Sequence, residues 1–71
     1  MLQFSGPHLR TRRQDAGLTL RDLADQAVLD VGYISQLETG HRTNPSSDVI
    51  RSIAASLHCT PNDFFAEQDT P

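Results

Sequence analysis

Residues 29–40, with the sequence LDVGYISQLETG, constrain the fold more than any other stretch of the chain. Asp30 can accept hydrogen bonds from the unpaired amides of a first helical turn, and Gly40 stands where a helix commonly ends in a left-handed residue. Ile34 and Leu37 are three positions apart, so they share one face of that helix. The stretch therefore predicts a short helix with an apolar side against the core and a polar side turned toward something else.

On either side of this stretch the sequence predicts further helices. Pro7 suits the first turn of one helix, which Gly17 ends. Thr19 caps the next helix, and Asp22, three residues later, makes a pattern close to a capping box. The link at 28–29 is too short for an antiparallel hairpin, so the helix that follows must cross the preceding one at a steep angle.

The remaining elements complete a small bundle. Pro45–Ser46 begins a fourth helix, and Thr60–Pro61 begins a last short one. No segment alternates convincingly like a strand. We therefore expect an all-α fold of five short helices, with residues 1–6 as a flexible leader, 7–66 as the domain and 67–71 as a frayed tail.

Size and composition restrict the class of protein. The chain has 71 residues, which is one small domain, and its stability is expected to be modest unless it pairs with a copy of itself. No apolar run approaches the ~20 residues of a membrane span, and no signal peptide pattern opens the chain. The single cysteine, Cys59, cannot form an internal disulfide and fits a reducing cytoplasm. We expect a cytoplasmic protein without membrane contact.

The charge distribution is uneven. The net charge is −3, whereas a nucleic-acid binder usually has positive charge on at least one face. Residues 8–42 contain five arginines and five acidic residues, which balance. Residues 43–71 contain only Arg51 against four acidic residues, so the acidic excess belongs to the second half. The first half therefore remains compatible with binding to DNA.

Two helices joined by a tight turn, the second with a polar outer face, form the geometry that places a helix in the DNA major groove. At this point the sequence resembles the Cro and phage-repressor type helix-turn-helix family, often called the XRE family. The most specific part is the pattern at Ile34, Ser35, Glu38 and Gly40. The resemblance covers about four-fifths of the chain and is carried by LRTRRQDAGLT, LTLRDLADQA, GYISQLETG, NPSSDVIRSIAASL and TPNDFF.

The resemblance implies a lambda-repressor-like fold and a role for each matching position. Residues matching Val31, Gly32 and Gln36 face base edges in relatives. Arg13 and Glu38 match a pair that forms an ion pair between the first and third helices. Positions near phosphates in relatives match Leu20 or Arg21, Tyr33, Thr39, Thr43 and Asn44.

The sequence also departs from the family pattern. Val28 occupies the turn position usually held by glycine, so the turn is expected to form without a left-handed residue there. Leu20 replaces a frequent glutamine and removes a polar contact. Arg12 and Ser47 stand where apolar residues are usual, and the base-facing pair at 31–32 offers no side-chain hydrogen bonds.

The contact residues have both functional and structural interpretations. Gln36 could pair with adenine through two hydrogen bonds, or it could be an exposed amide without a role. Val31 could touch a thymine methyl or pack on Leu20 at the helix start. Tyr33 is expected at a phosphate or sugar, because Ile34 and its neighbour at position 37 occupy the buried side. Candidate phosphate clamps that could equally just solvate the domain are Arg10, Arg12, His41 and Arg42, of which Arg42 is favoured.

Catalysis and metal binding find no support in the sequence. The three histidines and Cys59 are scattered and lack metal-ligand spacing. No serine, histidine and acidic residue form a recognisable catalytic pattern. We expect no enzyme, no metal and no cofactor.

The resulting hypothesis is a transcriptional regulator that binds double-stranded DNA as a homodimer through the helix at 30–39. Two copies on a two-fold axis require a palindromic operator with half-sites about 34 Å apart, and blocking polymerase makes repression the simplest outcome. Phe64 and Phe65 are the expected dimer contact, with the alternative that one or both close the core.

Other functions of the same fold stay open. A restriction–modification controller or an antitoxin would also bind DNA, and a toxin or an anti-repressor is a conceivable protein partner. A protein-binding adaptor that has lost DNA binding is the rival from a different class. The net charge, Leu20 and the donor-free pair at 31–32 favour that rival, whereas the arginines of the first half favour DNA.

Overall fold

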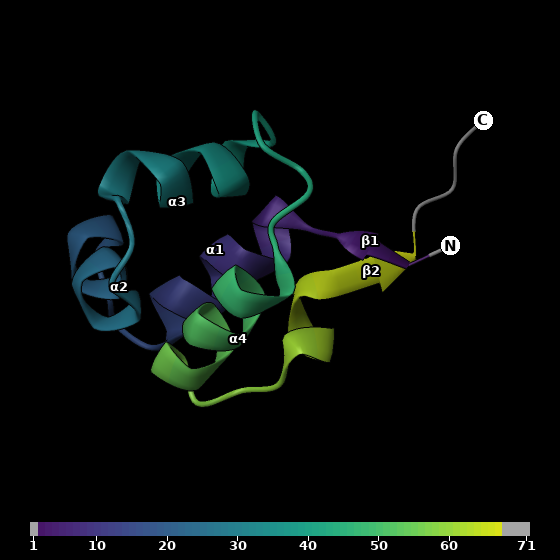
Figure 1. Ribbon diagram of the computed structural model, residues 1–71. Coiled ribbons are helices and arrows are strands. Elements are labelled where there is room, and N and C mark those ends of the chain that lie inside the picture. Colours follow the sequence, from purple (N-terminus) through teal and green to yellow (C-terminus); the bar gives the residue numbers. More distant parts are fainter. Residues whose placement is uncertain (1, 68–71) are drawn as a thin grey trace.

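The computed structural model describes residues 2–67 and arranges them as a helical bundle with a small sheet at one end (Figure 1). α3 forms one outer side of the bundle, and α2 lies beside it. In chain order the elements are β1 (Leu2–Phe4), α1 (Gly6–Asp15), α2 (Leu20–Ala27), α3 (Val31–Thr39), α4 (Ser47–Ser56), the 3₁₀ helix η1 (Pro61–Phe64) and β2 (Phe65–Glu67).

The expectation of five helices was wrong, and the expected flexible leader instead takes part in a small sheet. Half of the expected leader forms β1, which pairs antiparallel with β2, so that Leu2 lies opposite Glu67 and Phe4 opposite Phe65. The Phe4 ring packs edge-on against the Phe65 ring, with centroids 6.2 Å apart. Glu67, the first residue of the expected tail, belongs to β2, and residues 68–71 lie outside the described part.

The expected fifth helix is only one turn of 3₁₀ helix. Asp63 Oδ2 accepts a hydrogen bond from the Thr60 backbone amide (3.0 Å), which caps the start of η1. The turn cannot continue, because Phe65 adopts an extended backbone (φ −111°, ψ 142°) to pair with β1. Within residues 2–67 the fold therefore has four α-helices, η1 and a two-stranded sheet.

α1 begins against the end of α3. Ser5 caps the helix by accepting from the His8 amide, and Pro7 lies in the first turn as expected. A Cβ atom on Gly6 would lie 2.3 Å from the Leu37 carbonyl oxygen and 2.6 Å from that of Glu38. The absence of a side chain at this position therefore permits the close approach of the two helices.

The turn between α2 and α3 corrects a second expectation. Val28 does adopt the left-handed conformation (φ 57°, ψ 50°), although it is β-branched and 86% exposed. The Leu29 amide donates back to the Ala24 carbonyl (2.9 Å), and a left-handed residue is what lets the chain reverse in this way. The free energy gained by closing the turn therefore outweighs the cost of the left-handed conformation, which is about 1–2 kcal/mol for a residue with a side chain.

The core lies where α1, α2, α3 and α4 meet. α3 contributes Ile34 and Leu37, as its spacing predicted. Phe64 is completely buried, so its assignment to a dimer contact was wrong and the alternative that it closes the core holds. The completely buried large side chains are Leu9, Leu23, Ile34, Leu37, Ile53 and Phe64.

Candidate nucleic-acid interface

α3 presents a polar outer surface from a firmly capped helix. Asp30 Oδ2 accepts a hydrogen bond from the Tyr33 amide (3.2 Å), and Gly40 ends the helix at a φ of 92°. A Cβ on Gly32 would lie 2.9 Å from this same Asp30 oxygen, so glycine leaves room for the cap. The three predicted base-contacting residues, Val31, Gly32 and Gln36, are all exposed.

An ion pair attaches α3 to α1. Arg13 Nε donates to Glu38 Oε2 (2.7 Å), and Arg13 Nη2 donates to Glu38 Oε1 (3.1 Å). Arg13 Nη1 also donates to the Leu18 carbonyl (2.8 Å). The side chains of Arg13 and Glu38 are only 11% and 6% exposed. Hydrogen bonding to Glu38 raises the pKa of Arg13 despite the opposing effect of burial, so the arginine stays charged.

The chain after α3 folds back over the end of that helix. The Gln36 carbonyl accepts hydrogen bonds from the Gly40 amide (3.1 Å), the Arg42 amide (3.1 Å) and the Thr39 hydroxyl (3.3 Å). Arg42 Nε then donates to the side-chain oxygen of Gln36 (3.0 Å). The Arg42 guanidinium carbon lies 5.9 Å from the centroid of the Tyr33 ring. Arg42 therefore interacts with two other predicted contact residues, Gln36 and Tyr33.

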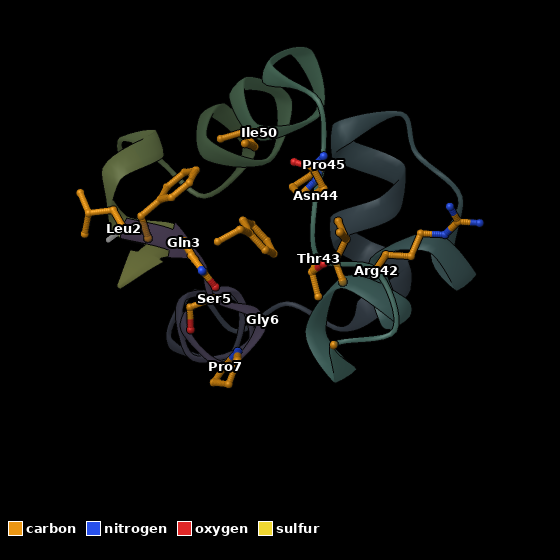
Figure 2. A pocket seen from close by; sticks show the side chains of 14 residues that line it. Leu2, Gln3, Ser5, Gly6, Pro7, Arg42, Thr43, Asn44, Pro45 and Ile50 are labelled. Carbon is orange, nitrogen blue, oxygen red and sulfur yellow. The ribbon is translucent and has the colours of Figure 1, made fainter. Parts of the chain in front are cut away.

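A groove of about 710 Å³ lies between residues 40–45 and β1. Thr43 and Asn44 line it and are exposed, whereas Pro45 is buried. Figure 2 shows the Arg42 side chain extending away from the groove. Arg42 is also one of the residues that line the groove, although its guanidinium points away from it.

A second hollow, of about 230 Å³, lies where α1, α2 and α3 meet. Three predicted backbone-contacting residues, Arg10, Leu20 and Thr39, line it, with Arg13 and Glu38 also in its wall. Ser35 lines the same hollow, although it was not among the predicted contacts. The sequence feature that could have identified Ser35 is its position one helical turn before Thr39, on the same face of α3.

Two of the remaining arginines have clear positions. Arg21 is exposed in the first turn of α2 and does not line this hollow. Arg12 Nη2 lies 3.1 Å from Asp63 Oδ1, which connects α1 to η1. The hydrogen bond from the Thr60 amide, followed by the Arg12 charge, lowers the pKa of Asp63. Arg12 therefore connects two elements of the fold through an ion pair, at a position where the family usually has an apolar residue.

Residues 2–67 contain several histidine, cysteine and acidic side chains. In that part of the chain no three histidine, cysteine or acidic side chains gather as a metal would require. Nor does any described helix combine the length and apolarity of a membrane span. Cys59 is a partly buried free thiol whose pKa is raised, mainly by burial.

Comparison with known proteins identifies the fold. A family model described as helix-turn-helix matches residues 9–64. The transcriptional regulator DdrOP3 of Deinococcus deserti is 46% identical over 56 residues, which are 79% of this chain and 43% of DdrOP3. The chain spans less than half of the length of the first curated relatives that it matches.

Solved structures agree in fold. The restriction–modification controller C.AhdI of Aeromonas hydrophila superposes with a TM-score of 0.80 at 35% identity, over 84% of this chain and 89% of that protein. The biofilm regulator SinR, in a complex with DNA, gives a TM-score of 0.78 at 28% identity, over 80% of this chain and 90% of that one. This chain therefore belongs to the XRE-type helix-turn-helix family.

Proposed function

We propose that the protein regulates transcription by placing α3 in the major groove of a specific DNA site. The observation that carries this proposal is the exposed outer surface of α3, held in a fixed position by two caps and by the Arg13–Glu38 ion pair. A reading helix must be rigid relative to its domain, because base edges are recognised by direct hydrogen bonds of defined geometry.

Each side chain on this surface suits a particular part of the groove. The Gln36 amide can donate to the N7 atom of adenine and accept from its N6 group. Val31, a residue that is 38% exposed, can contact a thymine methyl, and Gly32 lets the helix approach the base edges closely. These three residues are the proposed base contacts.

The proposed backbone contacts lie around α3. Arg10, Leu20 and Thr39 meet at one hollow, and their neighbour Arg21 is exposed in the first turn of α2. The amide groups at a helix start and the cationic side chains favour a phosphate at such positions. The other proposed backbone contacts are Tyr33, Arg42, Thr43 and Asn44.

A homodimer on a palindrome is the proposed assembly, since one domain of this size offers a modest interface to DNA. Two copies on a two-fold axis would contact half-sites about 34 Å apart. Phe65 is the proposed dimer contact, because it is partly exposed at the surface of the sheet, unlike Phe64. Repression by occlusion of polymerase is the simplest regulatory outcome.

A restriction–modification controller is the second candidate, and one observation favours it. C.AhdI is itself a restriction–modification controller, and it shares the fold of this chain with a TM-score of 0.80 at 35% identity. A role in binding another protein has separate support, since SinR is known in a complex with SinI. Both candidate functions use the same fold. The controller would differ in its target gene, and the protein-binding role would differ in its ligand.

A binding titration across several salt concentrations tests the proposal. The protein first selects a duplex from a random pool, and its affinity is then measured for that duplex and for a scrambled one. We expect affinity for the selected duplex to fall steeply with salt, because phosphate contacts release counterions. Gln36→Ala should lose about 1–3 kcal/mol on the selected duplex only. Absence of binding to either duplex at low salt would support the protein-binding adaptor instead.

A further inference from the structure

We propose that Arg42 sets the base specificity of Gln36 by holding its amide in one orientation before DNA binds. This inference rests on the proposed DNA-binding function and adds a positioning role to Arg42, for which a phosphate contact alone had been expected. A plain phosphate clamp carries no sequence information, whereas a residue that orients a base-reading amide affects selectivity.

The backbone brings Arg42 to this position. Gly40 adopts a left-handed conformation, which reverses the chain at the end of α3. The Gly40 and Arg42 amides then share the carbonyl of Gln36 as their acceptor, at 3.1 Å each. The start of the Arg42 side chain is therefore fixed relative to the residue whose side chain it contacts.

Two side-chain contacts then fix the guanidinium. Arg42 Nε donates to Gln36 Oε1 at 3.0 Å, and the guanidinium carbon lies 5.9 Å from the Tyr33 ring centroid. A guanidinium near an aromatic ring is attracted by the negative face of the ring. Tyr33 thus supports the arginine, and the arginine supports the amide.

This arrangement determines which groups Gln36 presents. Its oxygen accepts one hydrogen bond from Arg42 and keeps a second lone pair, while the amide nitrogen keeps both donors. Because Arg42 holds the side-chain oxygen, the amide nitrogen of Gln36 keeps one orientation. A purine N7 atom is the natural hydrogen-bond acceptor for that nitrogen. The remaining lone pair can accept from adenine N6, which favours adenine at this position.

Holding the amide in advance also affects affinity. An exposed glutamine samples several rotamers, and ordering it at an interface opposes binding. The contact with Arg42 restricts these rotamers in the free protein, so less ordering remains when DNA arrives. The hydrogen bond uses one of five guanidinium donors, which leaves the terminal nitrogens able to contact a phosphate.

A double-mutant cycle on selectivity tests the inference. The wild type, Gln36→Ala, Arg42→Ala and the double variant are titrated against the selected duplex and against duplexes with the other base pairs at the Gln36 position. We expect the wild type to discriminate about tenfold or more at this base pair. Arg42→Ala should remove most of that ratio, and it should have no further effect on the ratio in the Gln36→Ala background.

Arg10→Ala is the matched control, because it also removes an exposed arginine proposed to contact a phosphate. It should weaken binding to all duplexes about equally and leave the ratio at the Gln36 base pair unchanged. If Arg42→Ala behaves like Arg10→Ala, with the salt slope reduced by about one and the ratio intact, the positioning role is overturned.

A measurement without DNA separates this inference from the proposed function. In the free protein, the order parameter of the Gln36 side-chain amide should be high and should fall in Arg42→Ala, while the backbone amide of Ile34 stays rigid in both. An unchanged Gln36 order parameter overturns the positioning role alone. Failure of the wild type to bind any duplex at low salt overturns the DNA-binding function, and the specificity role with it, even where the amide is held.

Discussion

The guanidinium of Arg13 contacts both carboxylate oxygens of Glu38, and through them it joins the last turn of α1 to the last turn of α3. Both side chains are almost completely buried, and Arg13 also donates to the Leu18 carbonyl between the first two helices. The pair therefore determines the position of the exposed helix surface that we propose to contact DNA. Stability and DNA recognition are connected at this point in the fold.

Arg13→Ala should destabilise the protein by about 3–5 kcal/mol, because it leaves the Glu38 carboxylate buried without its partner. Thermal unfolding followed by circular dichroism measures the loss. Replacing both partners with apolar residues, Arg13→Met together with Glu38→Leu, should recover much of the stability, since no charge is then stranded. An unchanged melting temperature in Arg13→Ala would contradict this role of the pair.

Gly6→Ala should destabilise the protein by about 1–3 kcal/mol, even though alanine favours helices, because overpacking forces the backbone apart. The new methyl group would lie 2.3 Å from the Leu37 carbonyl oxygen, which belongs to the backbone of α3. Gly32→Ala is the comparison variant, since its methyl group would meet only the side chain of Asp30, and its cost should not exceed the loss of that helix cap, about 1 kcal/mol. Chemical denaturation measures the stability of both variants. If Gly6→Ala is as stable as the wild type or more stable, the prediction is wrong.

The capping box at the start of α2 should make stability depend on acid. Asp22 Oδ2 accepts from the Thr19 amide at 3.0 Å, and this hydrogen bond is the main reason that the pKa of Asp22 is lowered. The folded pKa lies below the unfolded value of about 3.9, so the contribution is complete above that pH and is lost as the pH falls through the folded pKa.

Urea denaturation of the wild type and of Asp22→Asn between pH 2 and pH 7 tests this dependence. The difference in unfolding free energy between the two proteins should be largest near neutral pH and should shrink in acid. Using the difference cancels the titration of other acids, including Asp63, whose pKa is also lowered. A difference that stays constant over the acid range would show that the Asp22 charge does not matter to folding.

Phe65→Glu should convert the proposed dimer to a monomer and weaken operator binding, with helix content retained. The ring of Phe65 is partly exposed and packs against Phe4, so a charge there disturbs the sheet surface more than the helical core. Sedimentation velocity measures the assembly state. Phe64→Ala is the contrasting variant, and loss of this buried ring should cost about 3–5 kcal/mol of stability. A dimer that persists in Phe65→Glu excludes this interface, and loss of its helical signal would assign Phe65 to the core.

The sequence by itself determined the four α-helices and the buried side of α3. Their starts and stops are local signals, such as the Thr19–Asp22 capping box and the left-handed Gly40, which involve residues within one turn of each other. The three-residue spacing of Ile34 and Leu37 placed both in the core. Local hydrogen bonds and helical periodicity need no knowledge of the rest of the fold.

Only the tertiary structure determined the contacts between segments that are distant in sequence and the conformation of the turns at which the chain reverses. β1 and β2 are three residues each, too short to show alternation, and they form only because residues 2–4 and 65–67 come together in the fold. Val28 becomes left-handed because closing the turn outweighs its local preference. Gln36 and Arg42 are neighbours because the chain reverses at Gly40 and Tyr33 lies beneath the guanidinium. Such contacts depend on how complete elements pack, which the identity of single residues does not determine.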